Sequence, residues 1–171
     1  MPINYQPITG VVTMISDFGA GYGREAGCNK LFSIESSDRG PVNFVVTPTT
    51  YFINHTMVAV GDTVTGFYNA NAPAPAIYPP QLEALVMAKT TPYQSVKVDF
   101  FDSQLVSSDG TLKLSISPST RIVLENGQLF TGDPTNRYLI VIYSITTRSI
   151  PAQTNPDEVV VICSYCQVNA P

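Results

Sequence analysis

Short apolar runs recur along the chain, and turn-forming residues separate them. In each run β-branched and aromatic residues alternate with polar ones or cluster, which predicts β-strands. The runs are Thr9–Ile15, Asn29–Glu35, Val42–Val46, Asp62–Tyr68, Leu82–Ala88, Val96–Phe101, Leu112–Ser117, Arg121–Glu125, Arg137–Tyr143 and Glu158–Tyr165. Turn pairs such as Asp109-Gly110, Asn126-Gly127 and Gly61-Asp62 lie between them. The pattern therefore predicts an all-β protein.

One segment leaves a choice between helix and strand. The stretch "PPQLEALVMAKT" contains good helix formers after two prolines, and a proline suits a first helical turn. The stretch aligns, however, with "EVVVI" near the end of the chain, whose β-branched residues favour a strand. We therefore expect a strand over Leu82–Ala88.

The chain repeats itself. "VNFVVTPTTYFI" from Val42 matches "LKLSISPSTRIV" from Leu112, including a Pro-x-Thr step in both. "FYNANAPAPAIYPPQLEALVM" from Phe67 matches "IYSITTRSIPAQTNPDEVVVI" from Ile142 without a gap, which aligns Tyr68 with Tyr143 and Glu83 with Glu158. The proline-rich segment Asn71–Gln81 is therefore predicted to be a crossover inside the first unit, and Lys89–Ser95 to be the linker.

Each unit of this size, with short strands and one long non-hairpin connection, suits a small Greek-key barrel of the OB type. The expected domains are a first β-barrel unit at residues 1–90 and a second at residues 91–171. The chain is thus expected to form two tandem OB-like barrels, or one β-sandwich or barrel built from two similar halves.

The motifs also carry a resemblance. The residues concerned are Val60-Gly61-Asp62 and Tyr68 in the first half and, after an insertion, Gly132-Asp133 and Tyr143 in the second. With the Pro-x-Thr turn and the Pro-bearing connection, this pattern resembles small OB-like barrel domains of bacterial proteins. The whole chain is similar to duplicated β-proteins of spore-forming bacteria. The resemblance implies a fold but no activity, because such barrels host many functions.

Charge is scarce in this chain. Charged residues make up 13% and the formal net charge is −4, whereas an ordinary soluble domain has roughly 25% charged residues. Nucleic-acid binding needs clustered Lys and Arg, so that partner is not expected. No apolar run is long enough to span a bilayer, and membrane insertion is not expected. A surface with so little charge predicts contact with a partner.

The N-terminal sequence contains no recognisable secretory signal. Synthesis in the cytoplasm is expected, or else a leader has been removed, and the cell or spore surface is a possible destination. Cys28, Cys163 and Cys166 do not form an even set, so they are candidates for an intermolecular disulfide. The "CSYC" spacing is also that of a zinc half-site, but Cys28 and His55 would have to complete it, and no metal or other cofactor is expected.

Three further motifs have plain structural interpretations. The loop "GAGYGREAG" from Gly19 has no helix after it and is not expected to bind phosphate. His55 is the only histidine and is expected in a loop, within a glycosylation sequon that starts at Asn54. The dispersed acids, including Asp109 and Asp133, fit turns and strand ends. The sequence contains no recognisable motif for a catalytic nucleophile, such as G-x-S-x-G, and no Asp-x-Asp-x-Asp-Gly calcium motif. An enzyme is therefore not expected.

Two functions remain. The first expectation is a structural subunit that associates with itself, through sheet edges and its terminal tails, into a filament or layer such as an extracellular or spore-associated fibre. The alternative is an OB-like binding module for an oligosaccharide or peptide, with Tyr22, Tyr78 and Tyr93 as candidate stacking residues.

Overall fold

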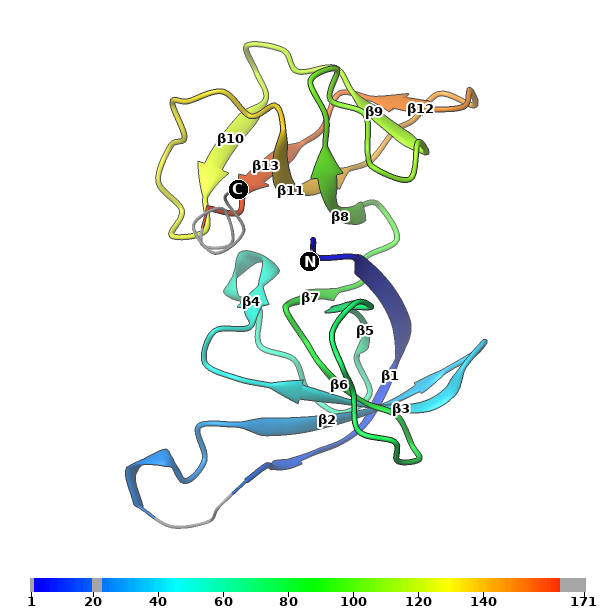
Figure 1. Cartoon of the computed structure of the whole chain (residues 1–171), viewed down its shortest axis with the longest axis vertical. Coiled ribbons are helices and arrows are strands. Elements are labelled where there is room, and N and C mark those ends of the chain that lie inside the picture. The colour runs from blue at the N-terminus through cyan, green and yellow to red at the C-terminus, as the bar shows by residue number, and fades with distance from the viewer. Residues whose placement is uncertain (1, 20–22, 164–171) are drawn as a thin grey trace. The chain divides into compact units, whose positions relative to one another are not determined.

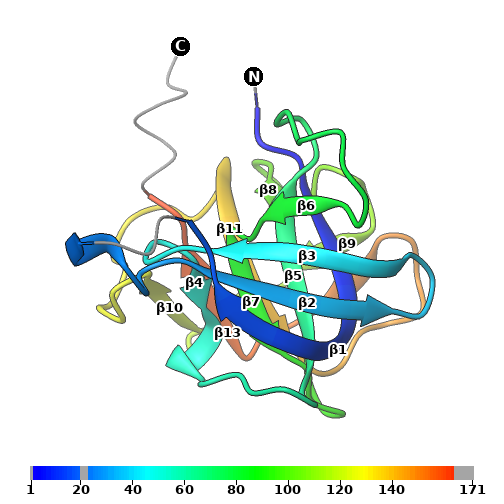
Figure 2. The same ribbon diagram turned by 90° about the horizontal axis from the view of Figure 1, so that it is seen from below.

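The computed structural model describes residues 2–19 and 23–163, and these residues form an all-β protein (Figures 1 and 2). The helices among them are two single turns, η1 at Gly23–Glu25 and η2 at Ile53–His55. The chain divides into two compact units between Thr90 and Thr91. We call residues 2–90 the first unit and the described residues from Thr91 onward the second unit, and describe each by itself.

The first unit contains one seven-stranded sheet in the order β4-β7-β5-β1-β2-β3-β6. Its strands are β1 (Tyr5–Asp17), β2 (Lys30–Ser36), β3 (Gly40–Val46), β4 (Tyr51–Phe52), β5 (Thr63–Asn69), β6 (Gln81–Glu83) and β7 (Val86–Lys89). β3 pairs with β6 and β4 with β7 in parallel, and the other neighbours are antiparallel. Inward-facing apolar residues of these strands, with Val58 and Ala84, form one core cluster.

A two-residue bend draws this sheet into a ring. The backbone N–H of Ala84 donates to the carbonyl of Val45 on β3, and the next N–H, that of Leu85, donates to Phe67 on β5. The single segment Gln81–Lys89 therefore joins β3 on one side to β5 on the other. The expected strand over Leu82–Ala88 is confirmed, but it is split by this bend into β6 and β7.

The second unit contains a four-stranded sheet, β10-β13-β11-β8, and a parallel pair, β12-β9. The strands are β8 (Ser95–Phe101), β9 (Leu112–Leu114), β10 (Arg121–Leu124), β11 (Arg137–Tyr143), β12 (Ala152–Thr154) and β13 (Glu158–Val161). Isolated bridges from Phe101 to Ser107 and from Val106 to Lys113 connect β8 to β9. β12 was not predicted, because Ala152–Thr154 is short and carries no apolar alternation.

The two units have the same strand order. β8, β9, β10, β11, β12 and β13 take the places of β1, β3, β4, β5, β6 and β7, with the same parallel and antiparallel partners. Only β2 has no full counterpart, since the bridged segment around Val106 stands in its place. The internal repeat seen in the sequence is therefore a repeat of topology.

The predicted gap-free alignment of the crossovers was wrong by three residues. Phe67 pairs with Val86, while the equivalent Ile142 pairs with Glu158. The second crossover is thus three residues shorter, and Glu158 is equivalent to Val86 rather than to Glu83. The sequence match showed no gap because proline-rich loops have no repeating apolar pattern. Nothing in the sequence therefore shows where the shorter loop lacks three residues.

The Pro-x-Thr steps form the same turn twice. In the first unit the Thr47 N–H donates to the Thr50 hydroxyl at 3.0 Å, and the Thr50 N–H donates back to the Thr47 carbonyl at 3.0 Å. In the second unit Ser117 and Thr120 repeat both bonds, at 3.1 and 3.0 Å. Each turn leads directly into the edge strand that follows it.

A second repeated turn escaped the sequence analysis. Ser36-Ser37-Asp38 and Ser107-Ser108-Asp109 both precede a glycine of positive φ, and in each the first serine hydroxyl donates to the aspartate at 2.6 Å.

The residue of the second unit that corresponds to Gly61 is not Gly132, which the resemblance had paired with it. Asn136, with φ 56°, stands directly before the residue that begins β11, whereas Gly132-Asp133 lies further back in the loop.

Candidate functional site

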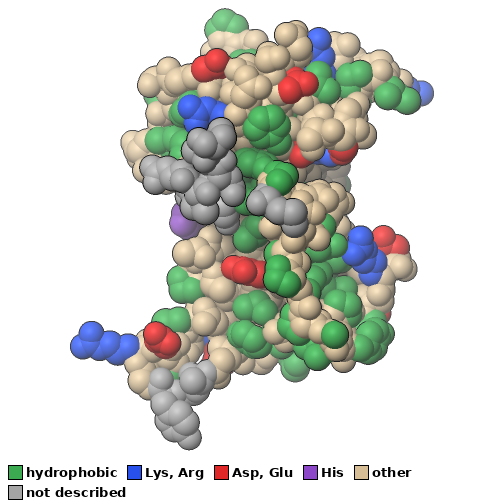
Figure 3. Space-filling view, in the orientation of Figure 1, with side chains coloured by type: hydrophobic (Ala, Val, Ile, Leu, Met, Phe, Trp, Pro, Cys, Tyr) green, Lys and Arg blue, Asp and Glu red, His purple; other side chains and the backbone are tan. Residues whose placement is uncertain are grey.

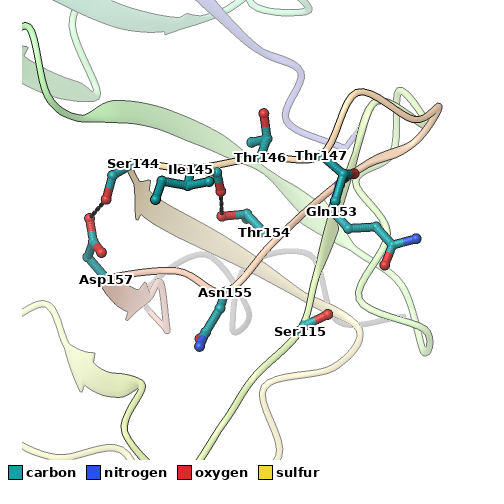
Figure 4. Close-up of a pocket in the computed structure, with 9 residues that line it drawn as sticks. All are labelled: Ser115, Ser144, Ile145, Thr146, Thr147, Gln153, Thr154, Asn155 and Asp157. Carbon is teal, nitrogen blue, oxygen red and sulfur yellow. Dashed lines mark hydrogen bonds between the residues drawn. The ribbon is translucent and has the colours of Figure 1, made fainter.

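A pocket of about 420 Å³ lies in the second unit where the crossover meets β12 (Figure 4). Three stretches of chain line it: the residue after β9, the start of the crossover after β11, and the segment from β12 to the residue before β13. The lining residues are Ser115, Ser144, Ile145, Thr146, Thr147, Gln153, Thr154, Asn155 and Asp157. Residues with hydroxyl or amide groups make up most of this set, while carbon atoms form the larger part of the exposed wall, which suits a ligand with both hydrogen-bonding groups and apolar surface.

The crossover holds its own backbone in place at the pocket. The buried Thr154 hydroxyl donates to the carbonyl of Ile145 at 2.6 Å. The Thr147 N–H donates to the Gln153 carbonyl at 2.9 Å, and the Thr147 hydroxyl accepts from the Gln153 N–H at 2.9 Å. These bonds fix the loop before any ligand arrives, which lowers the entropy lost on binding.

Asp157 and Asn155 are held by neighbours. The Ser144 hydroxyl donates to Oδ2 of Asp157 at 2.6 Å, and Gln94 donates to the same oxygen at 3.1 Å. Oδ1 of Asn155 accepts from the Thr120 hydroxyl at 2.9 Å, which ties the pocket to the second Pro-x-Thr turn. Figure 4 shows Asp157 directed toward Ser144 at one end of the site.

The first unit does not repeat this site. The equivalents of Asp157 and Thr154 are Leu85 and Leu82, and the start of its crossover is occupied by the N-terminal residues. There Asn69 Oδ1 accepts from the Asn4 N–H at 3.0 Å, and the Asn71 side chain donates to the Pro2 carbonyl at 2.9 Å. Hydroxyl-lined and apolar versions of one loop thus exist in the same chain.

The candidate stacking tyrosines are not brought together in one unit. Tyr78 lies in the first crossover and is 79% exposed, while Tyr93 lies before β8 in the second unit and is 76% exposed. Tyr22 lies outside the described residues. Neither described tyrosine lines the pocket. The signal that could have located the pocket is the density of hydroxyl and amide residues in "SITTRSIPAQTNPD", a stretch predicted only to be a connection.

The described cysteines are separate thiols. Cys28 is exposed in the β1–β2 loop, and its thiol lies 3.5 Å from the Arg24 carbonyl. Cys163 is half-buried against the second core, and Cys166 lies outside the described residues. Across residues 2–19 and 23–163 no three His, Cys, Asp or Glu side chains are grouped as a metal site would require. His55 lies exposed in η2 with φ 51°.

Several aspartates act in turns. The Ser36 hydroxyl holds the pKa of Asp38 below its ordinary value, and the backbone N–H groups of Ala59 and Thr135 do the same for Asp62 and Asp133. For Asp109 burial acts in the opposite direction, but hydrogen bonds from Lys97, Ser107 and Thr111 outweigh it and keep the pKa well below its ordinary value. These carboxylates stabilise the fold and lie outside the pocket.

Comparison with known proteins gives no relative for this chain. No family model matches it, and neither the curated proteins nor the solved structures contain a significant match. In the part of the chain that the structure describes, no helix has the length and apolar character needed to cross a membrane.

Proposed function

We propose that the chain is a tandem pair of OB-like Greek-key barrels and that the second barrel binds an oligosaccharide without acidic groups through its crossover. Support for the barrel assignment comes from the order of strands around each unit, which closes through a parallel pair, β3·β6 in the first unit and β9·β12 in the second. In OB folds the loops joining strands 1–2 and 4–5 line the ligand face. The crossover after β11 corresponds to the second of these loops.

The pocket in this crossover is the observation that carries the proposal. It presents hydroxyl, amide and carboxylate groups on a loop that is already hydrogen-bonded in place, and Ile145, 82% exposed, adds one exposed aliphatic side chain to the lining. Sugars need many convergent polar partners together with an apolar surface for their C–H faces. No Lys or Arg belongs to the lining, which argues against a phosphate-bearing ligand.

The chain offers a matched pair of variants for the test. Gln153 lines the pocket, and Gln81 holds the equivalent position on β6 of the first unit. Isothermal titration of the whole protein against neutral oligosaccharides should show saturable binding that Gln153→Ala weakens several-fold. Gln81→Ala should leave that binding unchanged. Absence of saturable binding across the panel, or equal weakening by both variants, contradicts the proposal.

Self-assembly is a second candidate function, favoured by exposed apolar side chains on a surface that shows few charges (Figure 3). Ile150 is 95% exposed, and the equivalent Tyr78 of the first crossover is 79% exposed, so an exposed apolar residue occurs at the same place in both units. Such residues can contact a second copy.

Two features of the described residues argue against self-association through sheet edges and terminal tails. The N-terminal residues are hydrogen-bonded to the crossover of their own unit. Edge strand β4 spans only Tyr51–Phe52, and β10 already receives the returning chain through the Leu124 and Phe130 N–H groups. Sedimentation velocity over a wide concentration range, with and without reductant, tests assembly; a single monomeric species throughout contradicts it.

A further inference from the structure

The pocket contains one carboxylate and, among its lining residues, no cationic side chain to balance it. Asp157 takes part in none of the ion pairs found between described residues. Its neighbour Glu158 is paired with Arg121 at 3.5 Å, so that cation is already engaged. Arg148 lies exposed on the same crossover but does not belong to the lining.

The partners of Asp157 are neutral and lie on one oxygen. Ser144 and Gln94 both donate to Oδ2, at 2.6 and 3.1 Å, and neither carries a charge. These two bonds set the orientation of the carboxylate and leave Oδ1 available to a ligand. A charge-assisted hydrogen bond from a cationic donor would be stronger than one from a neutral hydroxyl.

We propose that this pocket selects saccharides that carry a free, protonated amino group, such as oligomers of a 2-amino-2-deoxyhexose. The inference rests on the proposed function and names its ligand class. An amino group placed against Asp157 gains an ion pair, and the acetamide of the N-acetylated sugar loses that charge. A uronic acid brings a second carboxylate to the same place and is repelled.

The neighbouring groups suit the same ligand. Thr146, Gln153 and Asn155 also line the pocket and carry groups that can both donate and accept, which matches the hydroxyls of a sugar ring. The net charge of −4 adds a weak general attraction for cationic oligomers. A matched charge-removing control, Glu35→Gln on β2 of the first unit, separates this general attraction from the action of Asp157.

Calorimetric titrations of the full chain with three tetrasaccharides test the proposal: tetraglucosamine, its fully N-acetylated form, and tetragalacturonate. They are performed at about pH 5.5, where the amine is protonated and carboxylates are ionised. We expect tetraglucosamine to bind about fivefold more tightly than the N-acetylated form at low salt, and tetragalacturonate to bind least. Asp157→Asn should remove the preference for the amine, whereas Glu35→Gln should keep it.

A salt series on the unaltered protein gives a readout that needs no variant. The preference for tetraglucosamine over the N-acetylated form should shrink toward equality at about 1 M salt, where charges are screened beyond roughly 3 Å. Equal binding of the two forms at low salt, or a preference that Asp157→Asn retains, overturns this inference and leaves the proposed function standing. Failure of all three oligomers, together with the neutral panel, overturns both.

Discussion

A Cβ atom placed on Gly66 would lie 2.6 Å from Cε2 and Cζ of the Phe44 ring. Phe44 is fully buried in the first core, so its ring occupies the space that any side chain at position 66 would need. In the second unit the equivalent positions hold Val141 and Leu114, both in that unit's core. The two units thus fill one site in opposite ways, a large ring beside glycine or two aliphatic side chains.

This relationship predicts a coupled pair of substitutions. Gly66→Val should lower the free energy of unfolding by about 1–3 kcal/mol through overpacking, and Phe44→Leu should lower it by a similar amount through a cavity. The double variant brings together an aliphatic pair like that of the second unit. Its loss of unfolding free energy should be smaller than the sum of the losses in the two single variants. Urea unfolding of the four proteins measures the coupling; strictly additive losses contradict it.

The same Thr→Val substitution in the two Pro-x-Thr turns should lower the free energy of unfolding by different amounts. The Thr50 hydroxyl is buried and donates to the Ala84 carbonyl at 2.8 Å, at the bend that closes the ring. Thr50→Val should therefore cost about 1–3 kcal/mol of unfolding free energy. Thr120→Val removes the same turn bond, from the Ser117 N–H, but its hydroxyl donates to the exposed Asn155 side chain instead of a carbonyl at the bend, so the cost should be about 1 kcal/mol or less.

The second of these variants has a further consequence for binding. Because Thr120 holds Asn155 at the pocket, Thr120→Val should weaken oligosaccharide binding several-fold while leaving the protein folded. Thr50→Val lies in the other unit and serves as its control, with calorimetry in buffer without denaturant as the measurement. Unchanged affinity in Thr120→Val would show that Asn155 plays no part in binding.

The ionised carboxylate of Asp109 should stabilise the fold at neutral pH and stop doing so in acid. Burial raises its pKa, but the hydrogen bonds from Lys97, Ser107 and Thr111 act more strongly, so the folded pKa lies below the unfolded one. The stability from this carboxylate is therefore fully present above the unfolded pKa of about 4 and is lost as the pH falls toward the folded value. Asp109→Asn should cost about 1 kcal/mol at pH 7.

The difference between wild type and Asp109→Asn should remain constant from neutral pH down to about pH 5 and then shrink below about pH 4. Urea midpoints across this range measure it, and Glu35→Gln, an exposed carboxylate in the first unit, is the control. A gap that stays constant into strong acid would mean that the ionised Asp109 carboxylate contributes nothing specific.

Cys28 is expected to react with thiol reagents before Cys163. It is exposed, whereas Cys163 packs against the second core. In a Cys166→Ser background, a thiol reagent should modify Cys28 at least several times faster than Cys163, and mild oxidation should give a disulfide-linked dimer that Cys28→Ser abolishes. Non-reducing electrophoresis checks the dimer; dimers that persist in the Cys28→Ser protein refute this assignment.

The strands and the internal repeat could be predicted because both depend on local patterns. Runs such as Arg137–Tyr143 and Val42–Val46 carry β-branched residues between turns, and the Pro-x-Thr steps mark the same turn in each unit. The repeat also settled the strand at Val86–Lys89 against its helical propensity. In each case the type of element had a local sequence signal, whereas the order in which the strands pair had none.

What could not be predicted depends on contacts distant in sequence. The offset between the crossovers is fixed by where Asp157 and Leu85 donate, to Ile142 and Phe67, and no residue type records that choice. The N-terminal residues look like a free tail until Asn69 and Asn71 are seen to hold them. The pocket was missed for the same reason, since Ser115 joins Ser144 and Asp157 only through the pairing of β9 with β12.

Binding at the second crossover is the central claim, and ¹H–¹⁵N NMR titration of the full chain with tetraglucosamine and its N-acetylated form tests it most directly. The predicted result is saturable shifts of the amides of Ser144–Thr147 and Gln153–Asp157, while the equivalent first-unit segment around Gln81–Leu85 stays unchanged. Saturable shifts that leave the second crossover untouched, or no saturable shifts with any oligosaccharide of the panel, would contradict the account.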